Sequence, residues 1–387
     1  DIDAGDFALL LKSSPVEGPS AVDDSELCLM LYTSGTTGRP KGVPRSHRAE
    51  RLAATHCIAQ LYYQRGESSL CVMPIFHTMG VRAMLMAILL NGALVCQRTW
   101  DAEVAMQMIQ QEKIDTLFLV PTLFHDMLHH PNRGAYDLSS VQNIGFAGMA
   151  MTSDLTALCQ SEFNPRHFHN FYGSSEIFCF AVCDHVAEKP GCSGRAGIGQ
   201  IIRIVQADPD GGSGPDDFVA TGESGEIIVP MDGMEAFAGY WKRPDADKKS
   251  IRDGWYFTGD LGYFDEDGEL YVVGRVDDMV ISGGENIYPE EVEDVLSTSP
   301  LVEQVAVIGM PDDRMGSKIV AFVEPSSADC SAEALDAWCL ESTMARFKRP
   351  RAYVFVKRIP RSAAGKLLRR FLRDGDYEPN PDFDSTL

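Results

Sequence analysis

The segment YTSGTTGRPKG, at positions 32–42, combines glycines, hydroxyl side chains and a lysine in one short stretch. Glycines let the backbone turn its N–H groups inward, and Ser and Thr hydroxyls add donors for phosphate oxygens. Lys41 adds a mobile positive charge. The composition indicates a phosphate-binding loop, with an ordinary surface turn as the alternative. It is not a Walker A motif, which needs Gly-Lys-Ser/Thr, because Pro40 precedes Lys41 and Gly42 follows it.

Further polar motifs follow along the chain. They are FYGSSE at 171–176, YFTGD at 256–260, GRVDDMVISGGENIYPEEVE at 274–293 and GKLLRR at 365–370. In this order, the motifs resemble the adenylate-forming superfamily of acyl- and aryl-CoA synthetases, peptide-synthetase adenylation domains and firefly luciferase. The segments SGGENIYPEEVE and FKRPRAYVF are most similar to aryl-acid CoA ligases of the 4-chlorobenzoate type. The resemblance covers the chain from Ser25 to Arg370.

The resemblance implies an ATP- and Mg²⁺-dependent carboxylate–CoA ligase. A carboxylate would attack the α-phosphate of ATP, pyrophosphate would leave, and the thiol of CoA would open the acyl-adenylate. Because both reactants are anionic, catalysis would consist mostly of positioning and charge neutralisation. Two alternatives stay open: an adenylation enzyme that loads a carrier-protein thiol, and a non-catalytic relative.

The resemblance assigns the phosphates and the metal to two motifs. Glu176 supplies the carboxylate ligand that suits Mg²⁺, and its alternative is an ordinary surface carboxylate. Ser175 lies beside it on the phosphate, where the family more often has Thr. The expected ligands of the β- and γ-phosphates are Thr33, Ser34, Gly35, Thr36, Thr37, Gly38 and Lys41.

The same resemblance assigns the nucleoside. Asp260 would accept hydrogen bonds from both ribose hydroxyls, with Arg275 beside it. Tyr172 offers a flat ring for the adenine, although a core aromatic is an equal interpretation. The remaining expected residues of the AMP site are Gly173 in the Tyr172 motif and Ala147, Gly148 and Met149 in GFAGMAM at 145–151.

The C-terminal motifs imply a moving domain. Lys366 is the expected adenylation catalyst, because a compact ammonium can reach both the carboxylate and the α-phosphate. Asp277 is the expected hinge for the rotation between adenylation and thioester formation. Gly283 and Gly284 would lie against the pantetheine of CoA, or would simply form a turn.

The expected acyl pocket is mostly apolar. His77, in PIFHTMG, matches the position of an aromatic or His beside the acyl carboxylate, and a core histidine is the alternative. The full predicted lining is Phe76, His77, Met79, Phe146 and Ile177. Such a lining favours an aromatic or medium-chain acid over a charged one.

Strand and helix patterns alternate through the first two thirds of the chain, which predicts an α/β fold with mixed or parallel sheets flanked by helices. Expected strands are 27–33, 70–74, 92–97 and 116–121, and the helical pattern at 101–112 places Val104, Ala105, Met108 and Ile109 on one face. From about residue 196, short strands indicate a smaller antiparallel sheet.

A compact α+β pattern follows Arg275, with expected helices at 289–297 and 332–340 and expected strands at 304–309, 318–324 and 353–356. We therefore expect a large ATP- and acyl-binding domain at 1–276 and a small mobile α+β domain at 277–387, joined around 276–278. The tail from Asp374 is acidic and interrupted by prolines, which predicts disorder. Relatives carry a longer segment before the phosphate loop, so the front of the large domain is expected to be missing.

Bulk composition excludes several classes of partner. Asp and Glu number 56 and Lys and Arg 34, which gives a net charge of −22 and argues against nucleic acid or an anionic membrane. No apolar run is long enough to span a bilayer, and the N-terminus does not resemble a signal peptide. The protein is expected to be cytoplasmic, and oligomers stay possible.

The ten cysteines form no Cys-x-x-Cys pair. Cys179, Cys183 and Cys192 are the closest in sequence, and a metal site there is conceivable. No His stands at a spacing that would complete a tetrahedral set, so free thiols in a reducing compartment are the preferred interpretation.

Overall fold

The computed structural model describes residues 21–33, 40–208, 211–361 and 367–386, together with Leu9, Lys12 and Gly18. Its largest sheet has seven strands in the order β4-β3-β5-β6-β7-β8-β9. Pairing is parallel from β4 to β7 and antiparallel at β8 and β9. The strands are β3 (Ser68–Cys71), β4 (Ala93–Cys96), β5 (Thr116–Leu119), β6 (Asn143–Phe146), β7 (His167–Tyr172), β8 (Ala181–Cys183) and β9 (Arg195–Ala196).

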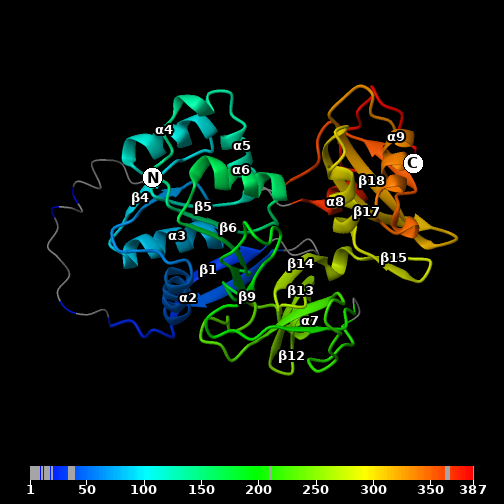
Figure 1. The fold of residues 1–387 in the computed structure, drawn as a ribbon. Coiled ribbons are helices and arrows are strands. Elements are labelled where there is room, and N and C mark those ends of the chain that lie inside the picture. Colours follow the sequence, from blue (N-terminus) through cyan, green and yellow to red (C-terminus); the bar gives the residue numbers. More distant parts are fainter. Residues whose placement is uncertain are drawn as a thin grey trace.

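Helices link the parallel strands and cover them (Figure 1). They are α2 (His47–Gln60), α3 (Thr78–Leu89), α4 (Ala102–Glu112), α5 (Pro121–Leu128) and α6 (Ser153–Phe163), with a short 3₁₀ turn η1 (Arg133–Ala135). All residues of β5 and β6 are buried, as expected for strands covered on both faces. The α/β prediction is confirmed. None of the helices in the described ranges is long and apolar enough to cross a membrane.

The predicted apolar face of α4 was partly wrong. Ala105 and Ile109 are buried as expected, but Met106 is also fully buried, whereas Val104 is exposed. Asp101 caps the helix by accepting the N–H of Val104 at 2.9 Å, which turns Val104 toward solvent in the first turn.

The phosphate-loop motif sits in a β-hairpin. β1 (Leu27–Thr33) has the predicted bounds, but it pairs antiparallel with β2 (Lys41–Ser46) and not within the large sheet. The strand β2 lies between the loop and α2, the helix toward which the loop motif runs. The apolar residues of β1 predict a buried strand, but Leu27 and Tyr32 are exposed. The hairpin places Thr33 opposite Lys41.

A second sheet confirms the predicted antiparallel texture. Its order is β10-β11-β13-β12, and β14 also pairs with β13. The elements are β10 (Arg203–Val205), β11 (Gly225–Pro230), α7 (Pro244–Ser250), β12 (Ile251–Arg252), β13 (Trp255–Phe264) and β14 (Leu270–Arg275). Figure 1 shows these elements below the large sheet, with β1 and α2 between the two.

The elements after β14 gather at one side of the molecule (Figure 1). The 3₁₀ turn η2 (Val276–Asp278) leads to them. They are β15 (Val280–Ser282), β16 (Glu285–Ile287), α8 (Pro289–Ser297), β17 (Val302–Asp312), β18 (Gly316–Pro325), α9 (Ala332–Glu341), η3 (Arg346–Lys348), β19 (Ala352–Phe355) and α10 (Arg369–Arg373). α8 has the predicted bounds, whereas β17 and β18 extend beyond them as one long hairpin.

The prediction of a disordered tail was wrong for the described residues after Asp374. The tail runs along β19: the N–H of Asn380 donates to the Phe355 carbonyl at 2.9 Å, and the N–H of Thr386 donates to the Tyr353 carbonyl at 2.9 Å. The ring of Phe383 lies 5.3 Å from that of Phe355. The tail satisfies backbone groups at the edge of β19, which is why an acidic composition did not leave it unstructured.

This packing predicts that the tail stabilises the C-terminal sheet. Phe383→Ala is expected to lower the free energy of unfolding by roughly 1–3 kcal/mol, because a partly buried aromatic contact with Phe355 is lost. Chemical denaturation of the full chain measures this. Asp382→Ala, at an exposed neighbouring position, is the control. Equal stability of the two variants would contradict the docked tail.

Candidate functional site

The mouth of the β1–β2 hairpin offers a first part of the site. Thr33 and Lys41 face each other where the strands end. The Thr33 hydroxyl is buried and has no hydrogen-bond partner within the described part of the chain, which suits a ligand oxygen. The predicted phosphate ligands Ser34, Gly35, Thr36, Thr37 and Gly38 lie outside the described residues.

Lys41 belongs to a buried polar chain with Tyr240 and Glu176. Its Nζ donates to the Tyr240 hydroxyl at 3.0 Å and lies 4.1 Å from the centre of that ring. Tyr240 donates in turn to Oε1 of Glu176 at 2.6 Å. Burial lowers the pKa of Lys41, and the Glu176 carboxylate opposes that shift. An anionic ligand at this position would likewise favour the charged lysine.

Two side chains, those of Ser174 and Arg45, hold the backbone of Glu176 in place. The Ser174 hydroxyl accepts the N–H groups of Glu176 at 3.1 Å and of Ile177 at 3.3 Å. The buried guanidinium of Arg45 donates to the Glu176 carbonyl at 2.7 Å. Gly173 is required here, because a Cβ would lie 1.6 Å from the Phe178 carbonyl oxygen. The turn therefore presents a nearly buried carboxylate in one orientation.

The Glu176 carboxylate fits a magnesium ligand. Oε1 accepts the hydrogen bond from Tyr240, whereas no residue within the described ranges donates a hydrogen bond to Oε2. Mg²⁺ prefers hard oxygen ligands such as this carboxylate, and Lys41 lies close by. The metal and the lysine would therefore neutralise the charge of the same phosphates. Ser175 is half-buried in the same turn.

A second cluster surrounds Asp260. Tyr172, the last residue of β7, donates to Oδ2 at 2.6 Å, and the Arg275 guanidinium donates to Oδ1. Asp260 and Arg275 are direct partners across β13 and β14. The Asp260 carboxylate raises the pKa of Arg275, and burial together with Asp260 raises the pKa of Tyr172. Each carboxylate oxygen can accept more than one hydrogen bond, so hydroxyl donors still fit.

The two clusters adjoin each other through aromatic packing. The ring of Phe180 lies 5.1 Å from that of Tyr172 and 6.4 Å from that of Tyr256. The Tyr256 hydroxyl is 3.4 Å from the Tyr240 hydroxyl. The predicted residues Lys41, Glu176, Tyr172, Asp260 and Arg275 are thus brought together where the hairpin and the two sheets meet.

The GFAGMAM segment leaves the large sheet beside β7. Phe146 and Asn170 are paired on parallel strands, so this segment and the Tyr172 motif emerge at the same sheet edge. Ala147 is buried, Met149 is exposed, and Gly148 has a φ of +89°, which favours glycine. Ligands of open α/β sheets bind at this edge. The adenine contacts stay a prediction.

The predicted acyl-pocket residues are not brought together. Met79, Phe146 and Ile177 are almost fully buried in three separate groups of core side chains, and Phe76 is 75% exposed. His77 caps α3 by accepting the Met79 N–H at 3.3 Å, and burial lowers the pKa of its ring. Packing and capping account for these residues, and their contact with an acid stays a prediction.

The C-terminal motif residues form a charged joint. Asp277, in η2, pairs with Lys249 at 3.3 Å. Arg369, at the start of α10, pairs with Asp278 at 3.2 Å, Glu290 at 2.9 Å and Glu293 at 2.7 Å. Lys366 lies outside the described residues. The hinge role of Asp277 stays a prediction.

The glycines expected at CoA form the turn of the β15–β16 hairpin. Gly283 and Gly284 both have positive φ, +61° and +90°, as a tight primed turn requires. A Cβ on Gly283 would lie 2.3 Å from Cε of Met315, whereas one on Gly284 would meet nothing. The turn alone explains both residues, and contact with CoA stays a prediction.

Sequence reasoning missed Tyr240, Ser174, Arg45 and Arg369. Tyr240 is a phenol in an apolar stretch, and only the packing of strands shows that it bridges Lys41 and Glu176. Arg369 lies in the GKLLRR motif, where it is one of several basic residues. The sequence therefore does not show that this arginine in particular forms ion pairs. Ser174, in the FYGSSE motif, could have been found as a Ser that caps its own turn.

The geometry defines an α/β protein in which two clusters adjoin each other at one edge of the large sheet. One cluster suits an anion, and the other suits a ribose. Comparison with known proteins gives the family. The model of the AMP-binding enzyme family matches residues 3–241, and that of the AMP-binding enzyme C-terminal domain matches residues 291–366. The chain belongs to the AMP-binding enzymes.

Individual relatives cover nearly all of the chain. A feruloyl-CoA synthase from Amycolatopsis sp is 35% identical over 380 residues, which are 96% of this chain and 73% of that protein. A 4-chlorobenzoate–CoA ligase from Arthrobacter sp is 34% identical over 91% of this chain and 68% of that protein. The solved structure of o-succinylbenzoate CoA synthetase (MenE) from Bacillus subtilis, with its acyl-adenylate intermediate OSB-AMP, superposes with a TM-score of 0.83 at 28% identity, covering 97% of this chain and 75% of that chain.

The site also predicts a pH dependence of stability. The buried Glu226 on β11 accepts the Gly259 N–H at 3.0 Å, beside Asp260, and burial raises its pKa from 4.5 to about 7. The folded protein therefore holds this proton more tightly than the unfolded chain, so stability falls as pH rises from 4.5 to 7. Urea denaturation of the wild type and of Glu226→Gln across that pH range isolates the contribution of the Glu226 carboxyl to the free energy of unfolding.

Relative to Glu226→Gln, the wild type is expected to lose up to about 3 kcal/mol of unfolding free energy over this interval. Other titrating groups are present in both proteins and cancel in the difference. Parallel pH profiles of the two proteins would contradict the raised pKa.

Proposed function

We propose that the protein is an ATP-dependent carboxylate–CoA ligase that activates an aromatic carboxylic acid. The acid and ATP give an acyl-adenylate and pyrophosphate, and CoA then gives acyl-CoA and AMP. The observation that carries the proposal is the meeting of the Lys41–Tyr240–Glu176 chain with the Tyr172–Asp260–Arg275 cluster. One cluster suits a triphosphate with its metal, and the other suits a ribose.

In the first step, a carboxylate oxygen of the acid bonds to the α-phosphorus, and the bond from that phosphorus to the bridging oxygen of pyrophosphate breaks. Lys41 and the 33–41 loop neutralise the phosphates, and Asp260 fixes the ribose. Glu176 would hold Mg²⁺, which supplies charge neutralisation on the phosphates when bound. Lys366 is the proposed cation between the acid and the α-phosphate.

In the second step, the CoA sulfur bonds to the acyl carbon, and AMP leaves as the carbon–oxygen bond to phosphate breaks. We propose that residues 277–387 rotate about Asp277 between the steps, as a unit separate from residues 1–276. The cores of the C-terminal elements support this division, because their buried members all lie between Val280 and Leu372. Gly283 and Gly284 would then approach the pantetheine.

The choice of an aromatic acid rests on the relatives and on the apolar surroundings of the site. The relatives include enzymes named for ferulate and 4-chlorobenzoate. We also propose a cytoplasmic location, because all ten cysteines are free, several of them buried in the core.

A pyrophosphate-exchange assay across a panel of acids tests the function. Hydroxycinnamic and benzoic acids are expected to support ATP–pyrophosphate exchange, and CoA is expected to convert the adenylate to a thioester detectable by mass. Succinate and acetate serve as matched controls for charge and size. Absence of ATP–pyrophosphate exchange with every acid would contradict the ligase proposal. Exchange without CoA-thioester would redirect it to a carrier-protein thiol.

Tyr240→Phe tests the bridging phenol. Its loss leaves Lys41 and Glu176 without their shared partner. The exchange rate is expected to fall roughly 10- to 100-fold, which corresponds to about 1.4–2.7 kcal/mol, the range of a hydrogen bond to a charged group. Tyr263→Phe is the control, because its ring stacks on Tyr271 at 5.2 Å, outside the two clusters. Unchanged exchange in Tyr240→Phe would refute the bridge.

A further inference from the structure

A cysteine–histidine cluster lies outside the candidate site. Single ligand atoms of Cys183, His185 and Cys192 all lie within 4.8 Å of one another. Cys183 ends β8, and the other two residues follow in the loop before β9. Both thiols are completely buried, and His185 is half-buried. The sequence-based expectation that no His completes a metal set was wrong, because it grouped Cys179 with the pair, and the described structure places His185 there.

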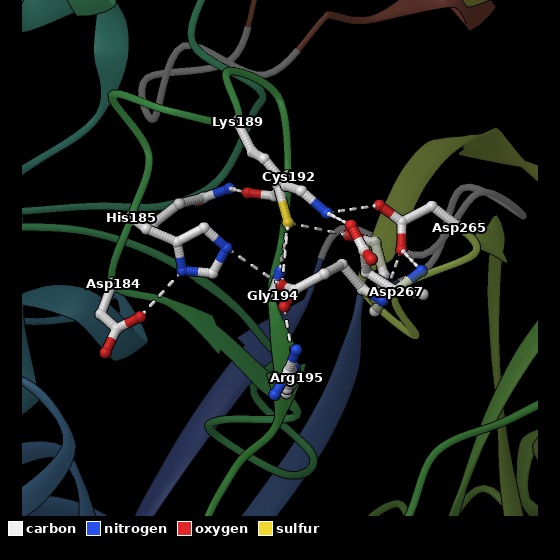
Figure 2. Close-up of polar contacts among 11 residues, drawn as sticks. Asp184, His185, Lys189, Cys192, Gly194, Arg195, Asp265 and Asp267 are labelled. Carbon is white, nitrogen blue, oxygen red and sulfur yellow. Dashed lines mark hydrogen bonds and ion pairs between the residues drawn. The ribbon is translucent and has the colours of Figure 1, made fainter.

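The surroundings orient the histidine as a ligand. Asp184 Oδ1 lies 2.9 Å from Nδ1 of His185, an arrangement that in the neutral ring places the proton on Nδ1 and the lone pair on Nε2 (Figure 2). Nε2 lies 3.4 Å from Oε2 of the buried Glu269. Carboxylates commonly fix metal-bound imidazoles in this way.

The carboxylate of Glu269 lies beside the cluster without belonging to its set of mutually close ligand atoms. Its Oε2 is 3.4 Å from Cys192 Sγ as well as 3.4 Å from His185 Nε2. Arg195 holds the other oxygen, Oε1, at 2.8 Å, so Oε2 is turned toward the cluster. Bonds of about 2.0–2.3 Å in a tetrahedron place ligand atoms roughly 3.3–3.8 Å apart. The separations from Oε2 to Cys192 and His185 fall in that interval, but Glu269 does not come within 4.8 Å of all three ligand atoms, so it flanks the site as a neighbouring charge.

We propose that Cys183, His185 and Cys192 bind Zn²⁺, with a water molecule as the fourth ligand. Thiolate and imidazole select zinc over magnesium or calcium. The Gly194 N–H donates to Cys192 Sγ at 3.1 Å, which stabilises a thiolate. Arg195 offsets the negative charge of the ligand set.

The cluster is reachable from solvent. A hollow of about 620 Å³ is lined by His185 and Glu269, together with Asp184, Lys189 and Arg195. It gives an ion a path to ligands that are otherwise buried.

The cluster lies where two sheets are fastened to each other. Around the cluster, the Ser193 N–H donates to the Leu270 carbonyl at 2.7 Å, and the Leu270 N–H donates to the Gly194 carbonyl at 2.7 Å. Lys189 pairs with Asp265 at 2.9 Å and Asp267 at 2.6 Å (Figure 2). The loop after β8 is thus fastened to the turn between β13 and β14. A zinc ion held in the loop after β8 would stiffen the segment that is fastened to this turn, a structural role that does not depend on the proposed activity.

Zinc binding to the full-length chain tests the proposal. Metal-depleted wild type, kept in a non-coordinating reductant, is titrated against a chromogenic zinc chelator and by elemental analysis after gel filtration. We expect one Zn²⁺ per chain, lost in Cys192→Ser. Cys159→Ser, a fully buried thiol in the core of the large sheet, is the matched control and is expected to keep the ion.

Two further measurements keep the test decisive if Cys192→Ser does not fold. Asp184→Asn is expected to weaken zinc affinity about 10- to 100-fold without changing the ligands. Co²⁺ added to metal-free wild type is expected to give thiolate-to-metal charge-transfer absorption and tetrahedral visible bands. Absence of those bands, or equal zinc affinity in wild type and Cys192→Ser, would overturn the site. A Cys183–Cys192 disulfide that persists in reductant would also overturn it.

Discussion

The carboxylate of Asp260 is the junction on which the candidate nucleotide site depends. It receives Tyr172 from the end of the seven-stranded sheet and Arg275 from the neighbouring strand of the antiparallel sheet. Hydrogen bonds between groups removed from water are stronger than at a surface, and leaving one unmade is costly. The ring of Tyr172 continues into Phe180 and then Tyr256, so polar and apolar contacts specify the same relative position of the sheets. A shift of either sheet would break both kinds of contact at once.

A chain with a net charge of −22 can still bind a triphosphate, because the cations that matter are few and placed in pairs. Arg45 is buried against Glu50, Arg275 against Asp260, and Lys41 approaches Glu176 through Tyr240. Each cation is held by a carboxylate when no ligand is near, which limits the cost of removing it from water. Burial already lowers the pKa of Lys41, so an incoming anion stabilises its charged form.

Periodicity predicted the α/β fold and the bounds of α8. The resemblance to the adenylate-forming superfamily implied most residues of the two clusters, since those residues lie inside the short contiguous motifs that carry it. They could not predict partners distant in sequence. Tyr240 joins Lys41 and Glu176 only after strands from three parts of the chain have packed. The proposed zinc ligands could not be predicted for a similar reason: Cys179 packs in the core that contains Cys57, whereas His185 is brought beside Cys183 and Cys192 by the fold of the loop after β8. The tail was misjudged because composition does not show the open edge of β19 that it covers.

One strand serves both the nucleotide cluster and the joint to the C-terminal elements. Gly274 on β14 approaches α8 so closely that a Cβ would lie 2.4 Å from Oε2 of Glu290, and the next residue, Arg275, binds Asp260. Glu290 is paired with Arg369, which also binds Asp278 in η2. The proposed rotation of the C-terminal elements would rearrange this partly buried charge group next to Arg275 on the same strand. We therefore expect binding at the Asp260 cluster and the angle at the joint to influence each other through β14.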